Sequence, residues 1–159
     1  MGRVTAWTLA LLATLPDVRA THVVVDAAGG EEWRVTVDLR NCGFLGTHCS
    51  VQALAVGAVR AHGMVSLELG VGQALAHGQL VHRVPHLTGR EKDFDSTRPV
   101  GTSGTVGNTN ELRLEWNITG GRGGRARVTA DFGRGGSVEC VIDLDDSDVG
   151  RSGSSNSRL

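Results

Sequence analysis

Residues 110–144 read NELRLEWNITGGRGGRARVTADFGRGGSVECVIDL, and this stretch decides the fold class. Apolar and polar residues alternate in three successive runs, which glycine-rich turns separate at 120–124 and 133–136. Such alternation is typical of strands that bury one face and expose the other. A polar face on every strand favours an antiparallel sheet over a parallel sheet that is buried on both sides. The stretch therefore predicts a three-stranded antiparallel meander, with Trp116 and Phe132 as anchors of the core.

Further strand patterns precede this stretch. Residues 33–39 alternate cleanly, and a β-branched run over 21–26 lies before them across a glycine-rich break, which predicts a hairpin. Residues 64–71 and 80–84 are also expected to be strands. Residues 51–62 fit either a short helix or two strands broken by a glycine, and their valines favour strands.

These patterns add up to roughly eight or nine short strands with glycine-rich turns, a pattern typical of all-β sandwiches and barrels. They predict an all-β fold, an antiparallel β-sandwich of Ig-like or jelly-roll type, in which a short helix at 51–62 is the one helical alternative. A small barrel is the rival architecture. A chain of 159 residues fits a single domain.

Residues 1–20 read as a secretory signal peptide. A positive residue near the start, an apolar run over 6–15 and small residues before a cleavage point after Ala20 form the usual pattern. The alternative is a buried N-terminal strand or helix. Nothing later in the sequence is apolar enough to span a membrane, so no transmembrane segment is expected after the signal peptide. The pattern predicts a secreted or surface-associated protein.

The rest of the chain is expected to hold one β-sandwich domain over residues 21–147. Residues 86–110 lack apolar periodicity and predict a long mobile surface loop, because structureless connections of that length are usually functional or disordered. We expect the polar residues 148–159 to form a disordered tail.

The three cysteines, Cys42, Cys49 and Cys140, are an odd number for an oxidising compartment. A Cys42–Cys140 disulfide is the favoured prediction, because a bridge that closes a longer loop removes more entropy from the unfolded chain. A Cys42–Cys49 bridge is one alternative, and three reduced, buried thiols in a cytosolic protein are the other. In the favoured arrangement Cys49 stays free or links two chains into a disulfide-linked oligomer.

Asn117 begins an Asn-Ile-Thr signal for N-glycosylation. The alternation around it places its side chain on the polar face of its strand, where a glycan transferase has access. The sequence therefore predicts that Asn117 carries a glycan.

The charged residues balance, with 16 Lys and Arg against 17 Asp and Glu. This balance gives no case for nucleic acid binding, which depends on the neutralisation of several phosphates. No motif predicts catalytic residues or a cofactor. His77 and His82 are weak candidates for a zinc or copper site, and we expect no metal there.

Two short segments are partly similar to the sequence boxes of T2-type ribonucleases. Residues 61–63 read Ala-His-Gly, and residues 114–120 read LEWNITG. The first box lacks its Trp-Pro pair, and the second lacks its two histidines and its lysine. At most the resemblance implies an inactive relative, because the second general acid/base is missing.

The favoured interpretation is a secreted or surface-exposed binding module without catalytic activity, such as a viral or cell-surface glycoprotein domain. A protein or glycan partner is expected to bind the 86–110 loop or the turn tips, since loops on a rigid scaffold commonly carry function. The alternative is a small secreted enzyme that depends on histidine, either a metal-dependent hydrolase or a degenerate ribonuclease-like protein.

Overall fold

The computed structural model of the protein describes residues 6, 8, 14–48, 51–58, 60–90 and 109–144. Its elements follow one another as β1 (Val18–Gly29), β2 (Glu32–Asn41), α2 (Val51–Ala55), β3 (Gly63–Glu68), β4 (Gln73–His77), β5 (Val81–Val84), β6 (Glu111–Gly120), β7 (Gly124–Asp131), the 3-10 turn η2 (Gly133–Gly135) and β8 (Ser137–Leu144).

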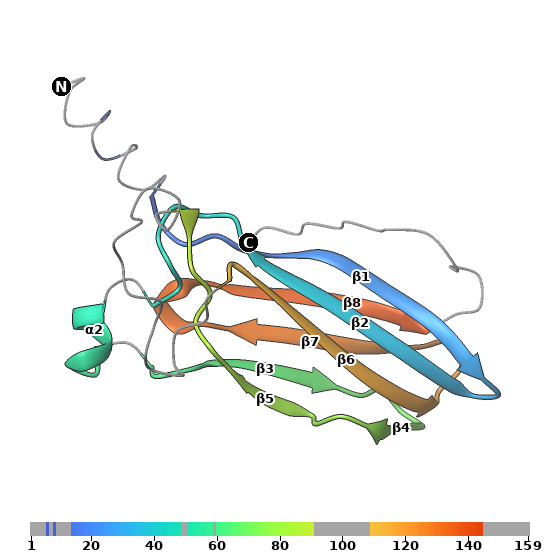
Figure 1. The fold of residues 1–159 in the computed structure, drawn as a ribbon. Helices are drawn as coiled ribbons and strands as arrows, with labels where there is room; N and C mark the ends of the chain where they lie inside the picture. The colour runs from blue at the N-terminus through green and yellow to red at the C-terminus, as the bar shows by residue number, and fades with distance from the viewer. Residues whose placement is uncertain are drawn as a thin grey trace.

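The strands form two four-stranded sheets that face each other (Figure 1). One sheet, called sheet A below, has the strand order β1-β2-β6-β4, and the other, sheet B, has the order β5-β3-β7-β8. Every strand pair is antiparallel. The predicted all-β sandwich is therefore confirmed, and the described strands do not close into the rival barrel.

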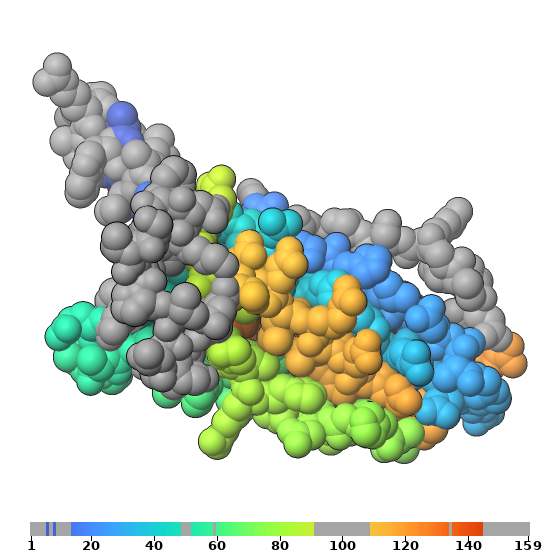
Figure 2. Space-filling model, viewed as in Figure 1, coloured from blue at the N-terminus to red at the C-terminus, as the bar shows by residue number. Residues whose placement is uncertain are grey.

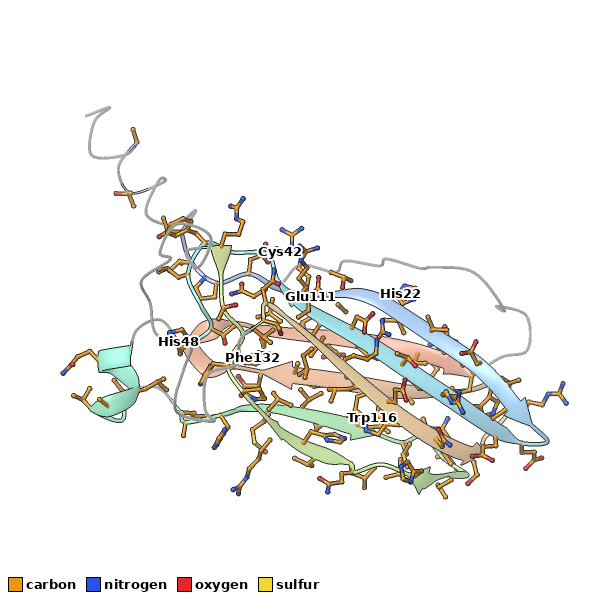
Figure 3. All side chains as sticks on the ribbon, viewed as in Figure 1. His22, Cys42, His48, Glu111, Trp116 and Phe132 are labelled. Atoms are coloured by element: carbon orange, nitrogen blue, oxygen red, sulfur yellow. The ribbon has the colours of Figure 1, made fainter. Side chains whose placement is uncertain are left out.

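The core lies between the inner faces of the two sheets. Along β2 the inward residues Trp33, Val35 and Val37 are almost fully buried, and the residues between them face solvent. Trp116 on β6 and Phe132 after β7 are 0% exposed, so the two predicted anchors are confirmed (Figure 3). Large apolar side chains buried from both sides supply most of the stability of such a sandwich.

The predicted hairpin near the N-terminus is confirmed, because β1 pairs with β2 over their whole lengths. It begins earlier than expected, at Val18, whose side chain is 8% exposed and belongs to the core. The segment before it also contacts the domain, since the Leu45 amide donates to the Thr14 carbonyl over 2.9 Å. Residues 14–20 thus pack as part of the domain. Signal-peptide cleavage after Ala20 stays a prediction.

The predicted meander over 110–144 is wrong in one respect. β6 belongs to sheet A, whereas β7 and β8 pair with each other in sheet B. The chain changes sheets at residues 120–124, where Gly120, Gly121 and Gly123 all have positive φ. These conformations suit glycine, and they let the chain cross over the end of the sandwich.

The strand interpretation of residues 51–62 is also wrong, because residues 51–55 form the short helix α2. The helix ends in a Schellman motif. Gly57 has φ of +69°, its amide donates to the Leu54 carbonyl, and the Ala58 amide donates to the Ala53 carbonyl. A glycine that breaks a strand pattern also ends a helix, and here the second role applies.

Some predicted features lie outside the described residues: Cys49, the centre of the 86–110 loop at 91–108, and the tail at 148–159. Among the helices that the structure describes, none is long and apolar enough to cross a membrane.

Candidate functional site

The polar groups buried in the described residues gather at the end of the sandwich where β2 ends and β6 begins. Four polar residues there are nearly or fully buried: Asn41, Thr47, His48 and His86. The two histidine rings lie 6.2 Å apart between centroids in an edge contact, and Figure 3 shows His48 and Phe132 at this end, next to α2. We call these four residues the end cluster.

Asn41 holds together three segments that are distant in sequence. Its Oδ1 accepts from the amides of Asp17 and Gly43, both at 3.0 Å. Its Nδ2 donates to the carbonyls of Leu45 at 2.9 Å and Thr88 at 3.1 Å. Two donor and two acceptor positions of the amide are thus filled, which a buried asparagine needs in order to be stable.

Thr47 and His86 form the second contact of the end cluster. Nε2 of His86 lies 2.8 Å from the Arg60 carbonyl, which can only accept, so Nε2 carries the proton. In the neutral ring Nδ1 is then an acceptor, and it accepts a hydrogen bond from the Thr47 hydroxyl at 3.0 Å. The Thr47 oxygen in turn accepts from the Leu87 amide at 2.9 Å.

Burial lowers the pKa of His86 below its ordinary value. The hydrogen bond to the Arg60 carbonyl opposes this effect, and the nearby His62 adds to it. The ring is neutral at neutral pH, and both of its nitrogens are occupied by protein groups. It therefore supports the fold, and it is not placed to act as a base or as a metal ligand.

Backbone hydrogen bonds beside the end cluster hold the residues on both sides of segment 91–108. On one side the Arg90 amide donates to the Gly43 carbonyl over 3.2 Å, and the Thr88 amide donates to Thr109 over 3.1 Å. On the other side the Asn41 amide donates to the Asn110 carbonyl over 2.8 Å. Residues 88–90 and 109–110, which flank segment 91–108, are thus tied to each other and to the end of β2.

The two weak metal candidates lie on different sheets. His77 ends β4 in sheet A and is exposed. His82 lies on β5 in sheet B, and its ring meets the edge of Trp116 at a centroid distance of 5.6 Å. Within the part of the chain that the structure describes, no three His, Cys, Asp or Glu side chains gather where they could hold a metal ion.

The structure does not bring together the two segments that resemble the ribonuclease boxes. Glu115 is exposed on the outer face of β6, because its neighbours Leu114 and Trp116 point inward. His62 directly precedes β3 in the other sheet. The strand periodicity of β6 accounts for Trp116, whose Nε1 donates to the Gln79 carbonyl over 2.8 Å.

Cys42 and Cys140, the two cysteines within the described ranges, are free thiols in the structure. Cys42 follows β2, and Cys140 lies on β8, where its Sγ contacts the Val128 carbonyl at 3.8 Å. Burial raises the pKa of Cys140 to about 11, and the Glu139 carboxylate adds to this. The predicted Cys42–Cys140 bridge is not formed in the structure, and it stays a prediction.

Asn117 lies on the outer face of β6, as its sequence pattern indicates. Its register partners are Arg34 on β2 and His77 on β4, the two strands that flank β6. Its Nδ2 donates to the Glu32 carboxylate over 3.1 Å. The side chain is half-buried. A glycan on Nδ2 would leave this nitrogen a single N–H for the contact with Glu32.

Sequence reasoning missed the end cluster. One signal was present for Asn41, since it occupies an inward position of the alternation that runs through Trp33, Val35, Val37 and Leu39. A polar residue at such a position needs internal partners. Thr47 and His86 lie in irregular segments, where no periodicity indicates burial.

The fold and the end cluster define an all-β sandwich with a buried polar network at one end. The chain belongs to the family described as Domain of unknown function (DUF8731), which matches residues 17–143. Neither the curated proteins nor the solved structures contain a match to it.

Proposed function

We propose that this protein is a secreted or surface-exposed binding module without catalytic activity, and that it recognises a protein or glycan through the 86–110 segment. The observation that carries the proposal is the hydrogen bonding that ties the residues on both sides of the 91–108 stretch to the end of β2 and to each other, through backbone groups on both sides and through Asn41 and Thr47 at residues 86–88. One of the four side-chain hydrogen bonds of Asn41 reaches the 86–110 segment, at the Thr88 carbonyl, and the Thr47 hydroxyl oxygen accepts from the Leu87 amide in the same segment. Recognition loops are commonly held in this way by a rigid scaffold.

The chemistry of the end cluster supports binding over catalysis. A general base needs a nitrogen that can reach a substrate, and both ring nitrogens of His86 are hydrogen-bonded within the protein. The small secreted enzyme dependent on histidine, as a metal-dependent hydrolase or a ribonuclease-like protein, is therefore the less favoured proposal. The turn at 120–124, with Arg122, is a secondary candidate for partner contact.

Exchange of residues 91–108 for a Gly/Ser linker of equal length tests the proposal. The purified, labelled protein is applied to arrays of glycans and of surface proteins, and the melting temperature of the variant is measured in parallel. We expect binding to fall at least about tenfold while folding is retained, a loss of about 1.4 kcal/mol in binding free energy. Arg122→Ser is the matched control at the opposite end of the sandwich.

Two results would contradict the proposal. One is binding that survives the linker exchange and disappears in Arg122→Ser, which would place recognition at the turn. The other is hydrolase or nuclease turnover that is lost in His62→Ala or Glu115→Ala, which would make the protein an enzyme.

The proposal that the protein is a secreted glycoprotein has its own test. After expression with residues 1–20 in a secreting eukaryotic cell, we expect a mass increase that an amidase for N-glycans removes. The increase should be absent in both Asn117→Gln and Thr119→Ala. Protein that stays in the cell without a glycan would contradict secretion.

A further inference from the structure

One edge of sheet A is formed by β1, which at 12 residues is the longest of the described strands. Within the described part of the chain, β1 pairs with β2 on one side and with no strand on the other. Figure 2 looks onto the outer face of sheet A and shows β1, in blue, along its border. The opposite edge of this sheet, β4, has only 5 residues.

An edge of this length usually carries features that prevent pairing, such as lysine, proline or a very short strand. β1 has neither lysine nor proline. Its pairing with β2 is irregular at Ala20/His22 and at Ala27/Gly29, and between these two points it is regular. The regular part is rich in β-branched residues, with three consecutive valines at 23–25. It is therefore suited to pair with another strand.

The residues of this regular part face in known directions. Val24 pairs with Thr36, which lies between the buried Val35 and Val37, so Val24 lies on the outer face of the sheet. By the same alternation Val23 and Val25 face inward and are half-buried. His22 and Asp26, on the outer face with Val24, are both exposed.

The regular part is complementary to a second copy of itself. In an antiparallel pair with Val24 opposite Val24 of the second copy, Val23 lies opposite Val25, and His22 lies opposite Asp26. The two-fold axis repeats each contact, which gives two valine pairs on the inner face and two His–Asp pairs on the outer face. Such cross-strand pairs are the contacts that stabilise a sheet.

The side chains of His22 and Asp26 are exposed and accessible for this pairing. Within the described residues, neither His22 nor Asp26 forms an ion pair or a side-chain hydrogen bond. Asp38 lies on β2 directly opposite His22. Its carboxylate already accepts two hydrogen bonds from Arg113, from Nε to Oδ1 at 2.7 Å and from Nη2 to Oδ2 at 2.8 Å. His22 also contributes, after Arg113, to the lowered pKa of Asp38, so Asp26 of a second copy would be an additional acidic neighbour for His22.

We propose that the protein forms a symmetric homodimer through β1, with Val24 at the two-fold axis, so that the two copies of sheet A join into one eight-stranded antiparallel sheet. The contact is non-covalent and separate from the segment proposed for partner recognition. It differs from a disulfide-linked oligomer, because it persists in reducing buffer.

Substitution of Val24 provides the test, because this residue meets itself only in the proposed register. The full chain is studied by sedimentation in reducing buffer over a range of concentrations. The unmodified protein should dimerise, whereas Val24→Lys and Val24→Glu should each be monomeric, since like charges meet at the axis. An equimolar mixture of the two variants should dimerise again. Thr36→Lys, on the same face but one strand inward, should dimerise like the unmodified protein.

Exchange of the outer pair gives a second readout. His22→Asp alone places two acidic pairs across the interface and should raise the dimer dissociation constant roughly tenfold. The double variant His22→Asp with Asp26→Arg should restore it. Two results would overturn the proposal: a full chain that is monomeric at all concentrations, whether or not it dimerises once residues 145–159 are removed, and Val24 variants that do not recover on mixing.

Discussion

The hydroxyl oxygen of Thr47 lies 3.0 Å from Nδ1 of His86, and both side chains are buried. The contact joins the segment after β2 to the segment after β5, which are 39 positions apart in the chain. The ring of His86 packs in addition against Phe132, with centroids 6.2 Å apart. One imidazole thus connects two irregular segments to the core residue that follows β7.

This contact should make stability depend on pH. Because burial lowers the pKa of His86 in the folded state, the unfolded chain takes up a proton first as the pH falls. The stability from neutral His86 is fully present above a pH of about 6.5, the ordinary value for an unfolded chain, and is lost as the pH falls below it towards the folded pKa. Urea unfolding at several pH values should show the free energy of unfolding falling more steeply for the unmodified protein than for His86→Gln. Equal slopes between pH 7.5 and 5 would contradict this.

Thr47→Val tests the hydroxyl separately. The valine keeps the shape of the side chain but leaves Nδ1 of His86 and the Leu87 amide without their partner. We expect a loss of about 1–3 kcal/mol in the free energy of unfolding at pH 7.5. Thr36→Val, the same change on the outer face of β2, should cost less than about 0.5 kcal/mol. Similar losses in the two variants would show that the Thr47 contact contributes little.

The fold class followed from the sequence because alternation reports directly which face of a strand is buried. The alternation does not indicate which of the two sheets a strand belongs to. Leu114 on β6 and Val128 on β7 both point into the core, although their strands lie in opposite layers. A meander and a pair of strands in facing sheets have the same alternation. The change of sheet depends on the positive φ angles of the glycines at 120–124. Glycine can adopt these angles but does not have to, so the sequence alone does not predict the change of sheet.

The burial of the end cluster could not be predicted from hydrophobic periodicity, for a different reason. Thr47 and His86 are brought together by tertiary contacts between irregular segments, and their burial has no local cause. The charged outer faces were easier to interpret, since residues such as Asp38 and Arg113 alternate with apolar ones along their strands.

Asn41 should be far more important for stability than Asn117. Asn41→Ala leaves the amides of Asp17 and Gly43 and two carbonyls without a partner at a fully buried position. We expect a cost of about 3 kcal/mol or more, because unsatisfied buried polar groups are expensive. Asn117→Ala removes one contact with a glutamate at the surface and should cost less than about 1 kcal/mol. Thermal and urea unfolding of both variants measures the difference, and losses of equal size would contradict the role assigned to Asn41.

The N-terminal boundary of the stable domain should lie before Thr21. A chain that begins at Thr14 keeps Val18 in the core and the Asp17 contact with Asn41, whereas a chain that begins at Thr21 loses both. We expect the longer chain to be more stable by about 2–4 kcal/mol, because the shorter chain loses the apolar burial of Val18 and one of the two hydrogen bonds that the Asn41 amide oxygen accepts. If the two chains unfold at the same urea concentration, residues 14–20 add nothing to the fold.

Gly43→Ala in the longer chain tests the same packing from the other side. A Cβ at this position would meet the Leu15 carbonyl oxygen and would lie 2.6 Å from the Asp17 nitrogen. The substitution should therefore displace residues 15–17 and lower stability towards that of the chain that begins at Thr21. Gly123→Ala is the control, since no atom lies near its added Cβ and only its positive φ opposes the change, at about 1–2 kcal/mol.

Cys140 should react slowly in the folded protein. With a pKa of about 11, only roughly one thiol in a thousand is ionised at pH 8, and the thiolate is the reactive form. In a variant that carries Cys42→Ser and Cys49→Ser, alkylation of Cys140 should accelerate about tenfold per pH unit up to the region of its pKa. In urea its rate at pH 8 should rise by more than tenfold, because unfolding restores the ordinary thiol pKa. Rapid alkylation of the folded variant at pH 8 would contradict the burial of this thiol. In the unmodified chain, purified without reductant, a mass lower by two hydrogens and a peptide that links Cys42 to Cys140 would instead show that the predicted disulfide forms.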